Sequence, residues 1–268
     1  MNDSSSNTES FDYRLFRFIL FAGATLFIFI RSGPAFEGTS ELWNPISFFQ
    51  LFEGPLPTTY LSTIKWMWLI TALLASINWG FSFTSKLALI LGSLFIGYEY
   101  NFGKVHHRTQ VYMGALFIMS FAPRFKKERS WHLHLVRLWV VYVMLTTGMQ
   151  KLYYGGGLDW AFSDSFFLKI YTLPYHTVAA QFLLDSPVFI SQLAAIFALV
   201  IVELLAPLSL TSKKMGILYF FIWTSFHPFV TLVFGRHYQF YSQIFVYAAF
   251  LPFSSLIPKK VRHYLKSP

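Results

Sequence analysis

Long apolar stretches, most of them close to 20 residues, alternate along the chain with short tracts that hold most of the charged residues. A stretch of that length can cross the hydrocarbon core of a bilayer as an α-helix, which satisfies its own backbone hydrogen bonds. The runs therefore predict an all-α, multi-pass membrane bundle of about eight transmembrane helices. The predicted helices cover residues 14–31, 60–80, 84–101, 109–123, 131–152, 188–210, 215–235 and 239–257.

The remaining segments are arranged around one transmembrane domain, residues 14–257. Residues 1–13 form a polar N-terminal tail, and residues 258–268 form a basic tail after the last helix. Two insertions, 32–59 and 153–187, interrupt the domain. Both contain runs of aromatic residues, which favour the membrane–water interface. We expect the first insertion to form an interfacial or re-entrant segment and the second to fold on the membrane surface.

The composition supports a membrane protein. Hydrophobic residues make up 55% of the chain and charged residues only 12%, whereas soluble domains usually carry about 25% charged residues. The net charge of +9 does not indicate nucleic-acid binding, because the basic residues lie at the ends of apolar runs. The absence of cysteine excludes disulfides, thiolate metal sites and thiol catalysis. The expected partners are membrane lipids and, in one interpretation, another membrane protein.

The distribution of Lys and Arg orients the predicted helices, because basic residues are enriched in cytoplasmic loops. A cytoplasmic N-terminus places a larger basic set inside: Arg14, Arg17, Lys86, Arg124, Lys126, Lys127, Arg129, Lys213, Lys214, Lys259, Lys260, Arg262 and Lys266. The smaller outer set is Arg31, Lys104, Arg108, Lys151, Lys169 and Arg236. Both termini are therefore predicted inside, and the expected location is a bacterial-type plasma (inner) membrane.

Lys151 ends the fifth predicted helix on the outer side and is the leading candidate for proton chemistry. Desolvation, or cations such as Arg108 and Arg236, would favour the neutral amine that acts as a general base. A lysine at a helix end also reaches the headgroups as a simple anchor, and the residues alone leave both interpretations open. Thr147 lies one turn earlier on the same helix face.

Two other chain segments reach the same outer face in this topology. His106 and His107 lie between the third and fourth predicted helices, and Arg236 and His237 lie between the seventh and eighth. The convergence of proton-active and cationic groups predicts an outer-facing cavity. Glu99, near the end of the third helix, is an acid that needs a partner at that depth.

Two polar residues lie within apolar helices. Glu203 is near mid-membrane, where a carboxylate costs about 2.5–3.5 kcal/mol on insertion scales and usually faces the bundle interior. His227 precedes Pro228 in the middle of the seventh helix. For each residue, a catalytic role and a structural bridge between helices both stay open. The spacing of His and acidic residues matches no metal motif, so no metal site is predicted.

Taken in order, these residues resemble the transmembrane domain of the vitamin K-dependent gamma-carboxylases, the horizontally transferred transmembrane (HTTM) family, over about the last 170 residues. The resemblance is carried by Gly148, Lys151 and Leu152 followed by Trp160, by Phe226–His227 with its following apolar span, by Glu203, and by the spacing of Glu99 and His106.

The resemblance implies a carboxylase-like, lyase-class membrane protein in which Lys151 deprotonates a reduced quinone such as vitamin K hydroquinone. His106 and His107 are both candidates for the family histidine. The carboxylases continue into a large lumenal domain that these 268 residues do not include. The resemblance therefore implies the fold and the lysine site rather than carboxylation of a protein substrate.

The favoured prediction is a membrane protein that binds a hydrophobic, quinone-like ligand in the outer cavity, with Lys151 as base. The residues expected to line the cavity are Glu99, Thr147, Trp160, Glu203, His227, Arg236 and His237. A non-catalytic membrane subunit that scaffolds a larger complex is the alternative. A transporter with a relay of Glu203, His227 and Arg137 is the third.

Overall fold

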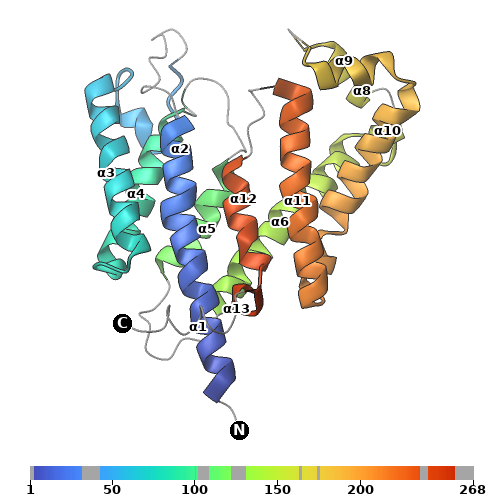
Figure 1. Cartoon of the computed structure of the whole chain (residues 1–268). Coiled ribbons are helices and arrows are strands. Elements are labelled where there is room, and N and C mark those ends of the chain that lie inside the picture. The colour runs from blue at the N-terminus through green and yellow to red at the C-terminus, as the bar shows by residue number, and fades with distance from the viewer. Residues whose placement is uncertain are drawn as a thin grey trace. The chain divides into compact units, whose positions relative to one another are not determined.

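The computed structural model describes residues 3–31, 43–99, 101, 109–121, 131–162, 165–173, 176–235 and 241–256. Within these ranges the chain is 85% helical and has no strand, which confirms the predicted all-α class. The chain divides into two compact units, one of Met1–Val136 with Pro252–Pro268 and one of Arg137–Leu251 (Figure 1).

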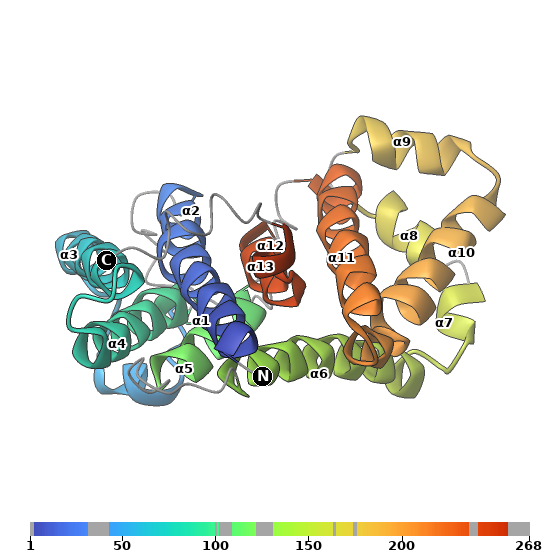
Figure 2. The same ribbon diagram turned by 60° about the horizontal axis from the view of Figure 1, so that its bottom comes forward.

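The first unit begins with a nearly continuous helix. It consists of α1 (Asp3–Phe18), the π-helical segment η1 (Ile19–Ala24) and α2 (Thr25–Arg31). Two longer helices, α3 (Thr58–Ser76) and α4 (Phe81–Glu99), form an antiparallel hairpin and lie side by side in Figures 1 and 2. The 3-10 helix η3 (Ser47–Leu51), α5 (Gln110–Ser120) and the short α13 (Phe253–Leu256) complete the unit.

Small residues allow the helices of the first unit to approach closely. The side chain of Trp68 on α3 lies against Gly92 on α4, where an added Cβ would be 2.8 Å from the indole Nε1. Ser120 on α5 donates to the backbone carbonyl of Ser85 at 2.9 Å. Such contacts hold apolar helices together where burial of hydrophobic surface gives little advantage over lipid.

Polar residues join segments at the helix ends of the first unit. Asp12 on α1 accepts from the backbone N–H of Ser254 at 2.5 Å and so caps the start of α13. Arg17 donates from Nη1 to the amide oxygen of Asn78 at 3.2 Å, in the turn between α3 and α4. The carbonyl of Asn101 accepts from the backbone N–H of Asn44 at 2.7 Å.

The second unit contains most of α6 (Trp131–Tyr154), whose first residues belong to the first unit. Three short helices follow, α7 (Asp159–Phe162), α8 (Ser165–Tyr171) and α9 (Val178–Asp185), and these fall in the predicted insertion 153–187. Next come α10 (Val188–Ile196), the π-helical η6 (Phe197–Leu204) and the 3-10 helix η7 (Ala206–Leu210). The unit ends with α11 (Lys213–Phe234), α12 (Tyr241–Tyr247) and η9 (Ala248–Phe250).

Two apolar clusters of buried residues pack within the described part of the second unit. One joins α8, α9 and the end of α11 through Ile170, Ala180, Leu183, Val233 and Phe234. The other joins α7, α10 and η6 through Ala161, Ala195 and Leu199. Trp160, Leu152 and Leu204 pack against this second cluster, which therefore supports the end of α6.

Three helices within the described ranges are long and apolar enough to cross a membrane: Phe11–Ile30, Phe81–Tyr98 and Lys213–Phe234. A fourth span is obtained if Val178–Asp185 and Val188–Leu204, which are bent by 117°, count as one. The described helices in the other predicted spans do not combine the length and the hydropathy that a membrane crossing needs. At 11 residues, α5 is about 16 Å long and shorter than a hydrocarbon core of about 30 Å. The eight spans therefore stay a prediction.

The contact between Trp68 and Gly92 predicts a specific sensitivity. We expect Gly92→Ala to lower the free energy of unfolding by about 1–3 kcal/mol, because the new methyl group overlaps the indole. Gly97→Ala on the same helix is the control, since its Cβ would meet Phe49 at 3.6 Å, an ordinary contact. Thermal unfolding in detergent measures both, and equal melting temperatures would contradict the predicted overlap.

Candidate functional site

Lys151 lies in the last turn of α6, and three glycines decide how that helix ends. The N–H of Gly155 donates to the Lys151 carbonyl at 2.8 Å, and the N–H of Gly157 donates to the Leu152 carbonyl at 2.7 Å. Gly156 has a φ of +83°, a conformation that glycine adopts without steric cost. This hydrogen-bonding pattern is typical of a Schellman-type helix end. It fixes the direction in which the chain leaves Lys151.

Trp160 returns to Lys151 immediately after this turn. The amine Nζ of Lys151 lies 4.7 Å from the centre of the Trp160 ring, which is cation–π distance. Gly155 makes the return possible, because a Cβ there would lie 2.7 Å from Trp160 Cδ1 and even closer to the Lys151 carbonyl oxygen. Lys151 and Trp160, the first expected as base and the second as a residue lining the cavity, are therefore in direct contact.

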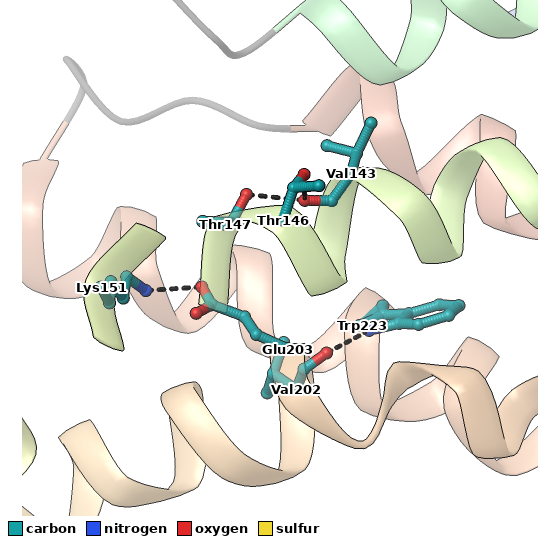
Figure 3. Close-up of polar contacts among 7 residues, drawn as sticks. All are labelled: Val143, Thr146, Thr147, Lys151, Val202, Glu203 and Trp223. Atoms are coloured by element: carbon teal, nitrogen blue, oxygen red, sulfur yellow. Dashed lines mark hydrogen bonds and ion pairs between the residues drawn. The ribbon is translucent and has the colours of Figure 1, made fainter. Parts of the chain in front are cut away.

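Glu203 supplies the charged partner of Lys151. Its Oε1 lies 2.5 Å from Lys151 Nζ, within an ion pair that joins η6 to α6 across 52 residues of sequence (Figure 3). The Lys151 side chain is 25% exposed, whereas that of Glu203 is 6% exposed. The second carboxylate oxygen, Oε2, is buried and has no hydrogen-bond partner within the described residues. One oxygen of the acid is thus engaged, and the other is buried without a hydrogen-bond partner among the described residues.

Gly148 allows the two helices to approach closely enough for this pair. An added Cβ at Gly148 would lie 3.0 Å from Glu203 Cβ and 3.0 Å from Leu204 Cδ2. Gly148 is one turn before Lys151, so the same face of α6 carries the close approach and the amine. The π-helical form of η6, a feature that often marks functional sites, places Glu203 against this face.

The electrostatics of Lys151 differ from the expectation. We expected desolvation or the cations Arg108 and Arg236 to favour the neutral amine, and both arginines lie outside the described residues. The charged neighbour that the structure places against Lys151 is an acid. The lysine therefore forms an acid–base pair with Glu203.

Thr147 and His227 lie in different surroundings. Thr147 is half-buried one turn before Lys151, and its hydroxyl donates to the Val143 carbonyl at 2.7 Å (Figure 3). His227 is buried on α11, and its Nδ1 lies 2.8 Å from the Trp223 carbonyl. A carbonyl only accepts, so Nδ1 carries the proton. The neighbouring Tyr247 hydroxyl donates to Gln243 at 2.7 Å.

Trp223 connects His227 with the helix that carries Glu203. Its backbone carbonyl bonds His227, and its indole Nε1 donates to the Val202 carbonyl at 3.0 Å. The hypothesis from the residues did not include Trp223, because an aromatic residue in an apolar helix gives no sign of a specific partner. The local signal is a proline at position 207, five residues after Val202. Proline has no N–H, so it cannot donate to the Val202 carbonyl at the spacing of a π-helix.

The remaining predicted site residues are not tested by these contacts. His106, His107, Arg236 and His237 lie outside the described residues, and Glu99 is the last residue of α4 in the first unit. Within the described ranges, no group of three or more His, Asp or Glu side chains is close enough to hold a metal ion.

Comparison of the chain with protein-family models, with curated proteins and with solved structures finds no match. The functional interpretation therefore depends on the geometry of the Lys151–Glu203 pair itself.

Breaking the pair from one side tests its energetic role. We expect Lys151→Met to lower the free energy of unfolding by about 3 kcal/mol, because the buried Glu203 carboxylate loses its counter-ion. The double variant Lys151→Met with Glu203→Leu is expected to regain most of this stability, since no buried charge remains. Chemical unfolding in detergent micelles measures both. Equal stability of the single and double variants would contradict a coupled pair.

Proposed function

We propose that this chain is a multi-pass membrane enzyme in which the Lys151–Glu203 pair takes a proton from an apolar, ring-containing ligand. The observation that carries the proposal is the 2.5 Å contact between Lys151 Nζ and Glu203 Oε1 beside the face of Trp160. An amine in contact with a buried carboxylate can pass its proton to that carboxylate, because low hydration makes the charged pair less favourable than it is in water.

The proton balance requires both members of the pair. Transfer of a proton from Lys151 Nζ to Glu203 leaves a neutral amine beside a neutral acid. The amine then accepts the proton of a ligand O–H group: that O–H bond breaks, an N–H bond forms, and the ligand anion remains next to the new ammonium. The ammonium stabilises this anion by charge. Glu203 keeps its proton until the ligand leaves.

The residues around the pair fit a flat, hydroxylated ring. The open Oε2 of Glu203 is a buried acceptor for an O–H group. The face of Trp160 and the half-buried Leu152 and Leu204 supply an apolar surface beside it. A reduced quinone, the ligand class implied by the resemblance to the HTTM family of carboxylases, has both features. It would supply the acidic hydroxyl, and these residues would orient it.

The proposal includes eight spans with both termini inside, in a bacterial-type inner membrane. Three contacts of the first unit support the relative sidedness of its segments, because they join segments that the predicted topology puts on the same side. Arg17 with Asn78 and Asp12 with Ser254 pair inner segments. Asn101 with Asn44 pairs outer segments.

A non-catalytic membrane subunit is the second candidate, and one observation favours it. The Lys151–Glu203 contact, with Gly148 beside it, also serves to hold α6 against η6. A purely structural pair needs no ligand. The two candidates predict different effects of a substitution that keeps the positive charge at position 151 but removes the lysine amine.

Lys151→Arg separates the two candidates. The probe is an apolar naphthol, whose ionised form absorbs at longer wavelength, added to protein in lipid nanodiscs near neutral pH. We expect wild-type protein to ionise the bound naphthol. In Lys151→Arg the absorbance of the ionised naphthol should fall at least about tenfold, because a guanidinium stays protonated at that pH and cannot accept the proton. Lys169→Arg, at an exposed lysine that also lies over an aromatic ring, is the matched control and should behave as wild type.

Full ionisation of the naphthol by Lys151→Arg would exclude lysine as the base. In that case, an unchanged melting temperature of the variant would favour the structural pair.

Single cysteines test the topology, since the chain has none of its own. A membrane-impermeant thiol reagent should label Lys127→Cys and Arg236→Cys from opposite sides of sealed vesicles, because the charge distribution puts these positions inside and outside respectively. Labelling of both from the same side would remove the outer-facing site from the proposal.

A further inference from the structure

The end of η6 has an unusual hydrogen-bonding problem. Within this π-helical segment the N–H of Leu205 donates to the Val200 carbonyl, five residues back, at 2.9 Å. The same spacing from the Val202 carbonyl leads to Pro207, which has no N–H to donate. A carbonyl buried in an apolar environment needs a donor, because an unmade hydrogen bond there is costly.

The indole of Trp223 supplies that donor. Its Nε1 donates to the Val202 carbonyl at 3.0 Å, and Figure 3 shows the indole directed at this oxygen from α11. Glu203 is the next residue after Val202. The indole therefore bonds the peptide group that leads directly into Glu203, the acid of the ion pair.

The indole is itself firmly held. Trp223 is fully buried, and three aromatic rings surround it, with ring centres 5.2 Å away for Tyr219, 5.3 Å for Tyr247 and 5.1 Å for Phe250. The backbone carbonyl of Trp223 is bonded by His227 Nδ1. Packing of this kind restricts the rotamer of the indole, so the N–H direction is fixed before any ligand binds.

We propose that Trp223 is a positioning residue for the Lys151–Glu203 pair: its indole N–H fixes the turn of η6 from which Glu203 reaches Lys151. Gly148 permits the close approach of Glu203 on the α6 side, and Trp223 holds the backbone from the α11 side. The inference rests on the proposed function, because the chemistry there requires proton transfer across a short contact. A displacement of about 1 Å is enough to disrupt such a contact.

The test measures the reactivity of the Lys151 amine without any ligand. Purified full-length protein in nanodiscs is treated with trace acetic anhydride over a range of pH, and peptide mass spectrometry gives the acetylation of Lys151 relative to Lys169. Glu203→Gln, which removes the anionic partner, is the reference for a lost ion pair. Tyr219→Phe is the matched control, because it keeps a ring against Trp223 and leaves the indole N–H in place.

We expect Trp223→Phe to raise the relative acetylation of Lys151 at fixed pH about threefold, toward the Glu203→Gln value, and to move its pH profile downward. The reason is that a displaced Glu203 stabilises the charged, unreactive amine less. Replacement of Trp223 by benzothienylalanine, which keeps the bicyclic shape and lacks the N–H, should give the same change without a loss of packing. Tyr219→Phe should match wild type.

Wild-type acetylation and an unchanged pH profile in the benzothienylalanine variant would overturn the positioning role. That result would leave the naphthol experiment on Lys151→Arg unaffected. A failure of naphthol ionisation in wild-type protein, by contrast, would reject the proposed function while the acetylation data still report on the geometry of the pair.

Discussion

An ionised side chain in an apolar helix is stable only where a neighbouring group compensates its charge, and the second unit is arranged around one such compensation. The Lys151–Glu203 pair joins the end of α6 to η6, with the carboxylate nearly fully buried and the amine partly exposed. Removal of either partner leaves a charge in a place where solvation is poor. Local features of the unit, from the glycines of α6 to the π-helical η6, are consistent with the formation of this contact.

Glycines make the contact sterically possible. Gly148 removes the side chain that would separate α6 from Glu203, and Gly155 allows Trp160 to fold back on the amine. These glycines lie in or beside the last turns of one helix, so a few residues decide both the packing and the polarity of the site. Membrane helices commonly use small residues in this way, because close packing must compensate for the weak hydrophobic drive in lipid.

The two members of the pair differ in exposure and surroundings, and this difference bears on the role proposed for each. Lys151 is the partner with access to the surroundings, and it lies beside an aromatic face. The backbone just before Glu203 is held by the indole of Trp223, which donates to the Val202 carbonyl. One carboxylate oxygen of Glu203 has no hydrogen-bond partner among the described residues. In the proposed function, an amine beside an acid that is held in place is pre-organised, which lowers the cost of reaching a reactive geometry.

The sequence by itself determined the helical class, because backbone hydrogen bonds in an apolar environment are satisfied within a helix. It also placed Lys151 at a helix end followed by a turn and Trp160, since glycine spacing and apolar periodicity are local properties. The charge partner of Lys151 was decided only by the tertiary structure. Nothing local connects Lys151 with a residue 52 positions away, and the expected cations were assigned from sidedness alone.

The tertiary structure also decided the role of Trp223. Its indole bonds a carbonyl 21 residues earlier, and that carbonyl needs a donor because the helix locally adopts π-helical geometry before Pro207. Hydrophobic periodicity cannot distinguish a π-helical turn from an α-helical one, since both have a continuous apolar pattern. The residues thus predict that Glu203 needs a partner, whereas the fold determines which amine it meets and which indole holds it there.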